Sequence, residues 1–517
     1  MTAVVLLCSA AGARAAEATG GPAAAGAAPP PAATAVAVPA ATARGDTALV
    51  LPEPADFGEM SWAGAFAELH TKLQREYAFT GWKRIDWPRL YARYAPRIAR
   101  AQWAADEVAY YLTLRRYTLE LRDGHVGVQP ASEEAQAVID RASARAAGGF
   151  GLVAARLENG RVVAAWVKPG GPAARGGVKT GARLLRWRGR PIDAALARVD
   201  TALSPTYPTS ARLDRERLRF LVRARVGTRR IVVFRNRGER IARRARLTAV
   251  ADDRLTLAMT DERSTMVIDG WPEKVVTSEI LPGNVGYVRV RLELDLPADV
   301  PGDHTPTLEQ FRQAVHAFVQ AGVSGVVVDV RRNSGGSDGM VAAMLSSLYA
   351  RRSFYEYADW YNTVTGLWEI WDTDEETGEP LTRDQGIWIE PGEERYDGPV
   401  VALVDNACVS SGEGLAMGIR RLDNGKTVGF HGTNGSFGMV GDGALLPGGF
   451  WVGWPFGRSL NAGKVVQLDS RPIRGVWHGG VAPDVRVPMT LRNVSRTLRG
   501  HDVVLEYGLV ELARMAD

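Results

Sequence analysis

Asn406-Ala-Cys-Val-Ser-Ser-Gly-Glu413 follows an apolar, strand-like run from Val400 to Val404. A helix is expected directly after it, because apolar residues recur at helical spacing from Leu415 to Leu422. A hydroxyl at such a strand-to-helix junction can be exposed beside backbone N–H groups, and acyl transfer needs a nucleophile beside such donors. Ser410 and Ser411 are therefore nucleophile candidates, or they merely cap the helix, since serine is a favoured cap residue.

A second junction of this kind lies upstream. Residues 324–330 form a continuous run rich in β-branched residues, which is typical of a buried parallel strand, and Asn333-Ser-Gly-Gly336 follows it. Gly335 and Gly336 let the backbone approach a substrate closely, so their N–H groups are candidates for half of an oxyanion hole. A phosphate cradle is the competing interpretation, but the lysine and the spacing of a P-loop are missing.

The first half of the chain predicts helices and then short strands. Residues 57–122 carry apolar side chains at helical spacing and end in Leu121-Arg-Asp-Gly-His125. Asp123-Gly124 is a turn signal, so His125 sits on a turn. A lone histidine on a turn usually faces solvent, and by itself it indicates function only weakly, although imidazole is the usual base near neutral pH.

Residues 148–250 alternate short strands with Gly and Pro turns, beginning at Gly148-Gly-Phe-Gly-Leu152. This order closely resembles a PDZ domain, although Ala182 stands where an Asp is usual. PDZ domains bind extended peptide ends by strand addition. The resemblance implies a peptide-binding loop at Gly149, Phe150, Gly151 and Leu152, whereas a small β-domain without a ligand is the alternative.

Size and composition limit the class of protein. The 517 residues exceed one ordinary core, so two or three domains are expected. The 46% hydrophobic fraction indicates a globular chain, and the charge of +5 arises from nearly balanced ionic residues. The histidines show no paired ligand spacing, and no nucleotide motif is present. We therefore expect no metal, no cofactor and no nucleic-acid partner.

The N-terminus predicts export. Residues 3–12 form an apolar run too short to span a bilayer, and Ala13-Arg14-Ala15 fits a small-x-small cleavage site. No other segment is long and apolar enough to cross a membrane. We expect a periplasmic or secreted protein whose mature chain has Cys408 as its single cysteine, because Cys8 lies in the predicted signal.

Six ordered motifs together resemble the S41 family of serine peptidases, which includes the C-terminal processing peptidases and the tricorn core. They are Leu121-Arg-Asp-Gly-His125, the PDZ-like block, Asp329-x-Arg-x-Asn-x-Gly-Gly336, Ser410-Ser-Gly-Glu413, Gly429-x-x-Gly-Thr-x-Gly435 and Gly480-Val-Ala-Pro-Asp484. The resemblance implies an α/β fold with a crotonase- or ClpP-like core of ββα units. With the composition, it divides the chain into a signal peptide (1–16), an Ala/Pro-rich disordered linker (17–50), an N-terminal helical domain (51–135), a PDZ-like domain (145–250), a connector (251–283) and a peptidase core (284–517).

The resemblance also implies roles for single residues. The family's nucleophile lies three residues before a glutamate, which here makes Ser410 the nucleophile and Glu413 the glutamate. Ser411 would supply one oxyanion-hole N–H, and Gly335 or Gly336 the other. Supporting positions are Asn333, Thr433, Glu413 and His478.

Members of the resembled family use two different bases. Processing peptidases use a lysine at the position of Ser436, so a Ser-Lys dyad looks absent, whereas tricorn-like members use the histidine that matches His125. Tricorn also has a serine where this chain has Gly124 and a glutamate where it has Trp477. The group that orients the base is therefore unidentified, and His478 is the next base to test.

Two function classes remain open at this point. The first is an exported serine endopeptidase that cleaves peptides or unstructured protein segments. The second is a non-catalytic binding protein on the same fold, whose apolar pocket the aromatic stretch Phe354–Trp371 could line. Self-compartmentalising assembly is a third hypothesis, and the oligomeric state stays open.

Overall fold

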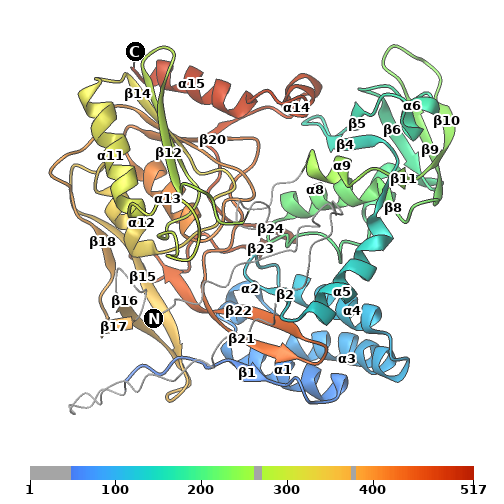
Figure 1. The fold of residues 1–517 in the computed structure, drawn as a ribbon, viewed down its shortest axis with the longest axis horizontal. Helices are drawn as coiled ribbons and strands as arrows, with labels where there is room; N and C mark the ends of the chain where they lie inside the picture. The colour runs from blue at the N-terminus through green and yellow to red at the C-terminus, as the bar shows by residue number, and fades with distance from the viewer. Residues whose placement is uncertain (1–47, 261–269, 374–379, 517) are drawn as a thin grey trace, which may run out of the picture.

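The computed structural model describes residues 48–260, 270–373 and 380–516 (Figure 1). The predicted signal peptide and nearly all of the predicted linker lie outside these residues. The described chain combines helices with parallel and antiparallel sheets, which confirms the predicted α/β class. No helix within the described ranges is long and apolar enough to cross a membrane.

A mainly parallel sheet forms the centre of the C-terminal half. Its strand order is β12 (Val276–Leu281), β13 (Val285–Val290), β14 (Gly325–Asp329), β19 (Val400–Leu403), β20 (Gly425–Gly429) and β25 (Val485–Arg486). Only β12 runs antiparallel to its neighbour. The predicted strand at 324–330 is thus confirmed as a buried parallel strand, β14.

Helices cover both faces of this sheet, which explains the continuous apolar runs. Val326 and Val328 pack in one core cluster with residues of α11 (Thr307–Gln320), α12 (Asp338–Leu345) and α13 (Ser411–Arg421). Figure 1 shows these helices beside the strands of the sheet. Val327 faces the other side, where it packs with residues of α15 (Val503–Ala516). Helix α14 (Leu491–Thr497) precedes α15 in the chain. Because side chains alternate along a strand, both faces of β14 need apolar residues.

A second sheet carries the longest strands. Its order is β1 (Ala55–Asp56), β21 (Met439–Leu446), β22 (Phe450–Leu460), β15 (Ser353–Asn362), β16 (Leu367–Thr373) and β17 (Pro380–Arg383), with β18 (Ile387–Ile389) on β15 and β2 (Gly127–Pro130) on β22. The aromatic stretch Phe354–Trp371 lies in the antiparallel pair β15–β16 of this sheet.

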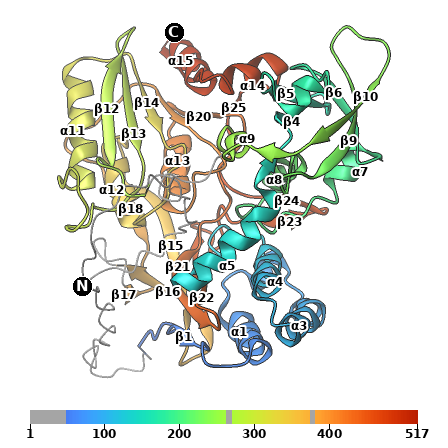
Figure 2. The ribbon, with the colours of Figure 1, turned by 45° about the vertical axis from the view of Figure 1, so that its right-hand side comes forward.

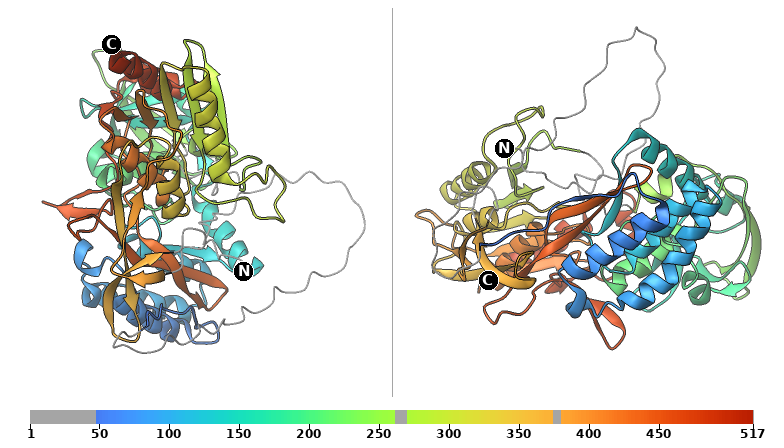
Figure 3. Two further views of the ribbon diagram at one scale, coloured as in Figure 1. Left: turned by 90° about the vertical axis from the view of Figure 1, so that its left-hand side faces the viewer. Right: turned by 90° about the horizontal axis from the view of Figure 1, so that it is seen from below.

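The N-terminal helices share a core with this second sheet. They are α1 (Trp62–Glu76), α2 (Thr80–Lys83), α3 (Trp87–Trp103), α4 (Glu107–Leu119) and α5 (Glu133–Ser143). Phe66 and Tyr110 belong to the same buried cluster as Phe450 and Trp454 of β22. Figure 3 shows the blue helices lying along the long orange strands. The turn that carries His125 is therefore fixed against the C-terminal half of the chain.

Residues 148–251 form two small sheets around a core of their own. The orders are β10-β9-β6-β5-β4, with β7 on β6, and β11-β3-β8. Figure 2 places them at one end of the molecule, joined through α5 to the N-terminal helices. The elements are β3 (Gly148–Gly149), β4 (Leu152–Arg156), β5 (Val162–Val167), α6 (Pro172–Arg175), β6 (Arg183–Trp187), β7 (Arg190–Pro191), α7 (Ile192–Leu196), α8 (Ser210–Leu221), β8 (Arg223–Ala224), β9 (Arg229–Arg235), β10 (Arg243–Thr248) and β11 (Val250–Ala251), followed by α9 (Leu255–Ala258).

The shared core gives a stability prediction. Trp454, on β22, is 0% exposed and packs in the same cluster as the N-terminal helices. Trp454→Ala should therefore lower the free energy of unfolding by about 3–5 kcal/mol. Trp103→Ala is the matched control, because Trp103 is 90% exposed and its loss should change stability by less than about 0.5 kcal/mol. Urea unfolding measures both. Equal effects would contradict a core shared between the two halves.

Candidate active site

Ser410 lies at the junction of β19 and α13 in an unusual backbone conformation. It occupies the N-cap position of α13 with φ +57° and ψ −137°, a region that few residues other than glycine adopt. Its side chain makes no capping hydrogen bond, and its Oγ has no hydrogen-bond partner within the described residues. The capping interpretation is therefore wrong for Ser410, which presents an unengaged hydroxyl instead.

The loop after β14 lies against this hydroxyl. Gly335 has φ +84°, and a Cβ built on it would lie 2.5 Å from the Cβ of Ser410. Ser411 Oγ donates to the carbonyl of Gly336 at 2.8 Å, and Val409 N–H donates to the carbonyl of Asn333 at 3.1 Å. The structure thus brings the predicted nucleophile and both predicted oxyanion-hole segments together.

Gly335 and Gly336 differ in whether their backbone N–H is free to bind an oxyanion. Gly335 N–H donates to Asn333 Oδ1 at 2.7 Å, so it is already engaged. The N–H groups of Gly336 and Ser411 have no hydrogen-bond partner in the part of the chain that the structure describes. Gly336 is also exposed, whereas Gly335 is buried. The chemistry of an oxyanion hole therefore fits Gly336 and Ser411 better than Gly335.

Asn333 shapes this loop from inside. Its side chain is fully buried, and Nδ2 donates to Glu293 Oε1 at 2.7 Å and to the carbonyl of Val290 at 3.1 Å. Burial raises the pKa of Glu293 to about 8, and the hydrogen bond from Asn333 opposes that rise. The Asn333 side chain therefore holds the loop that carries Gly335 and Gly336.

Glu413 holds the other side of the site. Its buried carboxyl accepts hydrogen bonds from Thr433 Oγ1 at 2.5 Å, Gly435 N–H at 2.9 Å and Ser436 N–H at 2.8 Å. Burial raises the pKa of Glu413 to about 8, and these hydrogen bonds oppose the rise. The carbonyl of Ser436 in turn accepts Ser410 N–H at 3.0 Å. Glu413 and Thr433 thus fix the turn that supports the nucleophile.

The same turn connects Ser410 to the predicted base. Gly124 N–H donates to Ser436 Oγ at 2.6 Å, so His125 follows a residue that contacts Ser436. A Cβ on Gly124 would lie 2.5 Å from Asn434 Oδ1 and 2.9 Å from Ser436 Oγ. A side chain at position 124 would therefore require Asn434 and Ser436 to move.

The His125 ring is largely enclosed, with its side chain 9% exposed. Both ring nitrogens lack a hydrogen-bond partner among the described residues, so no hydrogen bond joins the imidazole to Ser410 in this structure. Burial lowers the pKa of His125 below its usual value; the carboxylate of Asp123 opposes this and Lys83 adds to it. The imidazole is therefore neutral near neutral pH and able to accept a proton.

Sequence reasoning missed a carboxylate beside this ring. Asp123 Oδ1 lies 3.7 Å from His125 Nδ1 and accepts the backbone N–H of His125 at 2.9 Å. The signal was present in the sequence, because Asp123 belongs to the same Asp-Gly-His motif. As a turn signal alone, Asp123-Gly124 did not indicate this contact.

Two other predicted site regions lie apart from these contacts. His478 is exposed on β24 (Val476–His478), where it pairs with Arg471 of β23 (Arg471–Ile473), and it makes no hydrogen bond with His125. In the predicted peptide-binding loop, Phe150 and Leu152 are buried in the local core, so they offer only backbone to a ligand. The loop begins at Gly149 in β3 and turns at Gly151, which has φ +72°. It ends at Leu152, the first residue of the edge strand β4.

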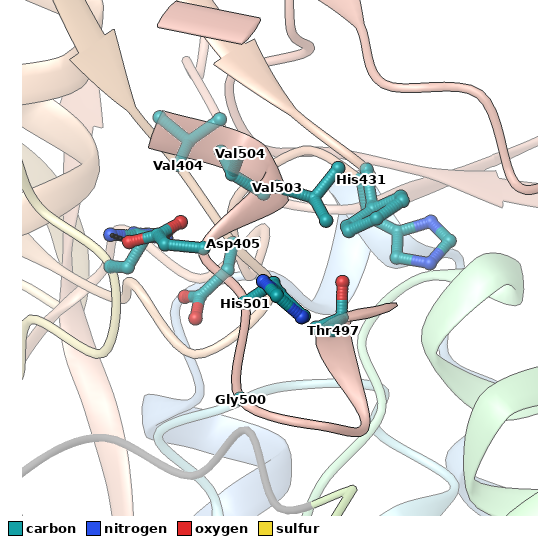
Figure 4. Close-up of a pocket in the computed structure, with 11 residues that line it drawn as sticks. Val404, Asp405, His431, Thr497, Gly500, His501, Val503 and Val504 are labelled. Carbon is teal, nitrogen blue, oxygen red and sulfur yellow. Dashed lines mark hydrogen bonds and ion pairs between the residues drawn. The ribbon is translucent and has the colours of Figure 1, made fainter. Parts of the chain in front are cut away.

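A pocket of about 330 Å³ lies at the carboxyl ends of β14, β19 and β20 (Figure 4). Figure 4 shows His501 between Asp405 and Thr497. The guanidinium of Arg331 pairs with Asp329 at 2.6 Å and with Asp502 at 2.7 Å. The lining contains neither Ser410 nor His125, so this pocket is not the site of the predicted chemistry.

Comparison with known proteins identifies the C-terminal half. Residues 284–487 match the model of peptidase family S41. These residues form a serine-type peptidase domain of this family. The match includes β13 through β25, with Ser410 and the loop at Gly335, whereas His125 lies outside it.

Solved structures show the same fold. Mature CPAF in complex with lactacystin is 16% identical, with a TM-score of 0.56 over 88% of this chain and 98% of that chain. Mature CPAF alone is 15% identical, with a TM-score of 0.54 over 88% and 97%. The photosystem II D1 C-terminal processing protease is 19% identical over 86% and 98%, and its TM-score of 0.34 is too low to support an argument. No curated protein matched the chain.

The contact between Gly335 and Ser410 gives a prediction for the S41 site. Gly335→Ala should reduce labelling of Ser410 by a serine-directed fluorophosphonate at least 100-fold, because the new methyl overlaps the Ser410 side chain. Gly322→Ala is the matched control: Gly322 also has a positive φ, +58°, but open space beside it. It should strain the backbone yet keep labelling within about threefold. Equal loss in both variants would show that strain alone disturbs the site.

Proposed function

We propose that the chain is an active serine endopeptidase in which Ser410 is the nucleophile and His125 the general base. The observation that carries this proposal is the position of Ser410: an uncapped hydroxyl on a strained turn, beside the unpaired N–H groups of Gly336 and Ser411. Strain of this kind persists where the surrounding contacts enforce it, and it is concentrated at functional sites.

The proposed reaction follows from these positions. His125 accepts the Oγ proton of Ser410 as Oγ attacks the substrate carbonyl, and the N–H groups of Gly336 and Ser411 stabilise the oxyanion. The imidazolium then gives its proton to the leaving amine, and water hydrolyses the acyl-enzyme by the same route. The contact between Ser410 and His125 forms when substrate binds, since catalytic hydrogen bonds are often loose in the free enzyme.

We further propose that the substrate is an extended peptide or an unstructured segment of a protein. The support is the PDZ-like order of residues 148–250 and the edge strand β4, to which an extended chain can add. The apolar run at 3–12, followed by Ala13-Arg14-Ala15, supports export. N-terminal sequencing of the protein recovered from a cell envelope fraction tests export, and an uncleaved N-terminus there would contradict it.

Labelling tests the nucleophile and the base. Ser410→Ala should abolish reaction with a fluorophosphonate, and His125→Ala should slow it by about 100-fold or more, since general-base catalysis contributes roughly that factor. Ser132→Ala is the matched control, because its hydroxyl caps α5 and lies outside the site. It should retain full labelling. A folded wild type that resists labelling would favour the binding-protein hypothesis.

The protonation state of the base gives a pH prediction. The reactive form of His125 is neutral, and burial lowers the pKa of this imidazole below its usual value. The acid limb of the pH–rate profile is the range in which labelling is lost as the imidazole becomes protonated. Its midpoint should therefore lie below about pH 6.5, the pKa of an unperturbed histidine. Rates measured from about pH 4.5 to 8.5 locate the limb. A limb above about pH 6.5 would contradict a buried, neutral base.

A further inference from the structure

A buried lysine lies behind the proposed base. Lys83 ends the short helix α2, and its side chain is 0% exposed. Its Nζ lies 2.8 Å from Asp123 Oδ2 and 3.6 Å from Asp469 Oδ1, and it donates to the carbonyl of Arg122 at 3.1 Å. A buried ammonium is costly unless it is paired, so this geometry favours an ionised carboxylate at Asp123, the nearer of the two acidic groups.

The two oxygens of Asp123 face different partners. Oδ2 accepts hydrogen bonds from Lys83 and, at 2.7 Å, from the hydroxyl of Tyr77. Oδ1 accepts the backbone N–H of His125 and faces its Nδ1 at 3.7 Å. The carboxylate is thus held at one oxygen and presents the other to the imidazole.

We infer that Asp123 orients the His125 base, and that Lys83 keeps Asp123 ionised and in place. Both act through His125, so they are positioning residues, and the inference rests on the proposed function. A carboxylate beside an imidazole fixes the ring orientation and stabilises the imidazolium that forms during reaction. Asp123 therefore fills the role for which the chain has no glutamate, since Trp477 stands at that position.

The other groups around the pair leave this arrangement intact. Asp469 accepts Phe437 N–H at 3.1 Å, and burial raises its pKa well above its usual value, although Lys83 opposes that rise. Glu413, on α13, also has a raised pKa, of about 8. Burial raises the pKa of Tyr77 well above its usual range, so its hydroxyl stays a donor. Lys83 and Asp123 are therefore the charged pair that faces His125.

Lys83 and Asp123 act on the pKa of His125 with opposite signs. The carboxylate of Asp123 raises that pKa, and the ammonium of Lys83 lowers it. Removing the carboxylate should move the acid limb of the labelling rate to lower pH. Removing the ammonium should move the limb to higher pH for two reasons. The imidazole loses a neighbouring positive charge, and Asp123 is protonated at a higher pH, which removes the carboxylate that orients the base.

The experiment measures the rate of fluorophosphonate labelling against pH for Asp123→Asn and Lys83→Met. We expect Asp123→Asn to lower the plateau at least 10-fold and shift the limb down. We expect Lys83→Met to shift the limb up and keep the plateau within about 10-fold of wild type. A purely structural role lowers the plateau without moving the two limbs in opposite directions, and that result would overturn the inference.

Further variants keep the test decisive. Lys83→Arg retains the charge and should retain the wild-type limb. If Lys83→Met does not fold, Tyr77→Phe removes the second donor to the same oxygen, and it should shift the limb up by a smaller amount. An unmoved limb in Tyr77→Phe would then count against the inference. Absence of labelling in the folded wild type, or labelling that persists in Ser410→Ala, would instead reject the proposed function.

Discussion

The site depends on the close approach of two backbone segments that follow neighbouring parallel strands. The loop after β14 reaches Ser410 so closely that no side chain fits at Gly335. Parallel strands make this approach possible, because their carboxyl ends meet at one edge of the sheet. The hydrogen bond from Ser411 Oγ to Gly336 then fixes both segments, and the strained turn at Ser410 follows from that enclosure.

Around this contact, the protein stabilises buried carboxyl groups by surrounding them with donors. Glu413 receives its hydrogen bonds from Thr433 and the turn at Gly435 and Ser436, and Glu293 receives one from Asn333. A buried polar group without partners would cost several kcal/mol, so each of these carboxyl groups constrains the loop that donates to it. Rigidity of the site is therefore a consequence of its buried polar contacts.

The proposed base comes from a different part of the chain. It lies on a turn between α4 and β2, and β2 pairs with β22 in the second sheet. The N-terminal helices and β22 share one apolar core, so folding of the two halves brings the turn to Ser436. The proposed catalytic residues therefore require the tertiary structure of nearly the whole chain, although the S41 match covers only residues 284–487.

The sequence alone determined the elements that depend on local pattern. Apolar periodicity predicted the helices of the N-terminal region, and a continuous β-branched run predicted the buried strand at β14. The resemblance of Ser410-Ser-Gly-Glu413 to the S41 motif indicated the nucleophile candidate. Only the tertiary structure decided three further points: that Ser410 does not cap its helix, that Gly336 rather than Gly335 has a free N–H, and that Asp123 and Lys83 lie behind His125. His478, predicted as a supporting residue, lies exposed on a hairpin. The physical reason is that hydrogen bonds and ion pairs between distant residues have no period along the chain, whereas the burial of one face of a helix or strand does.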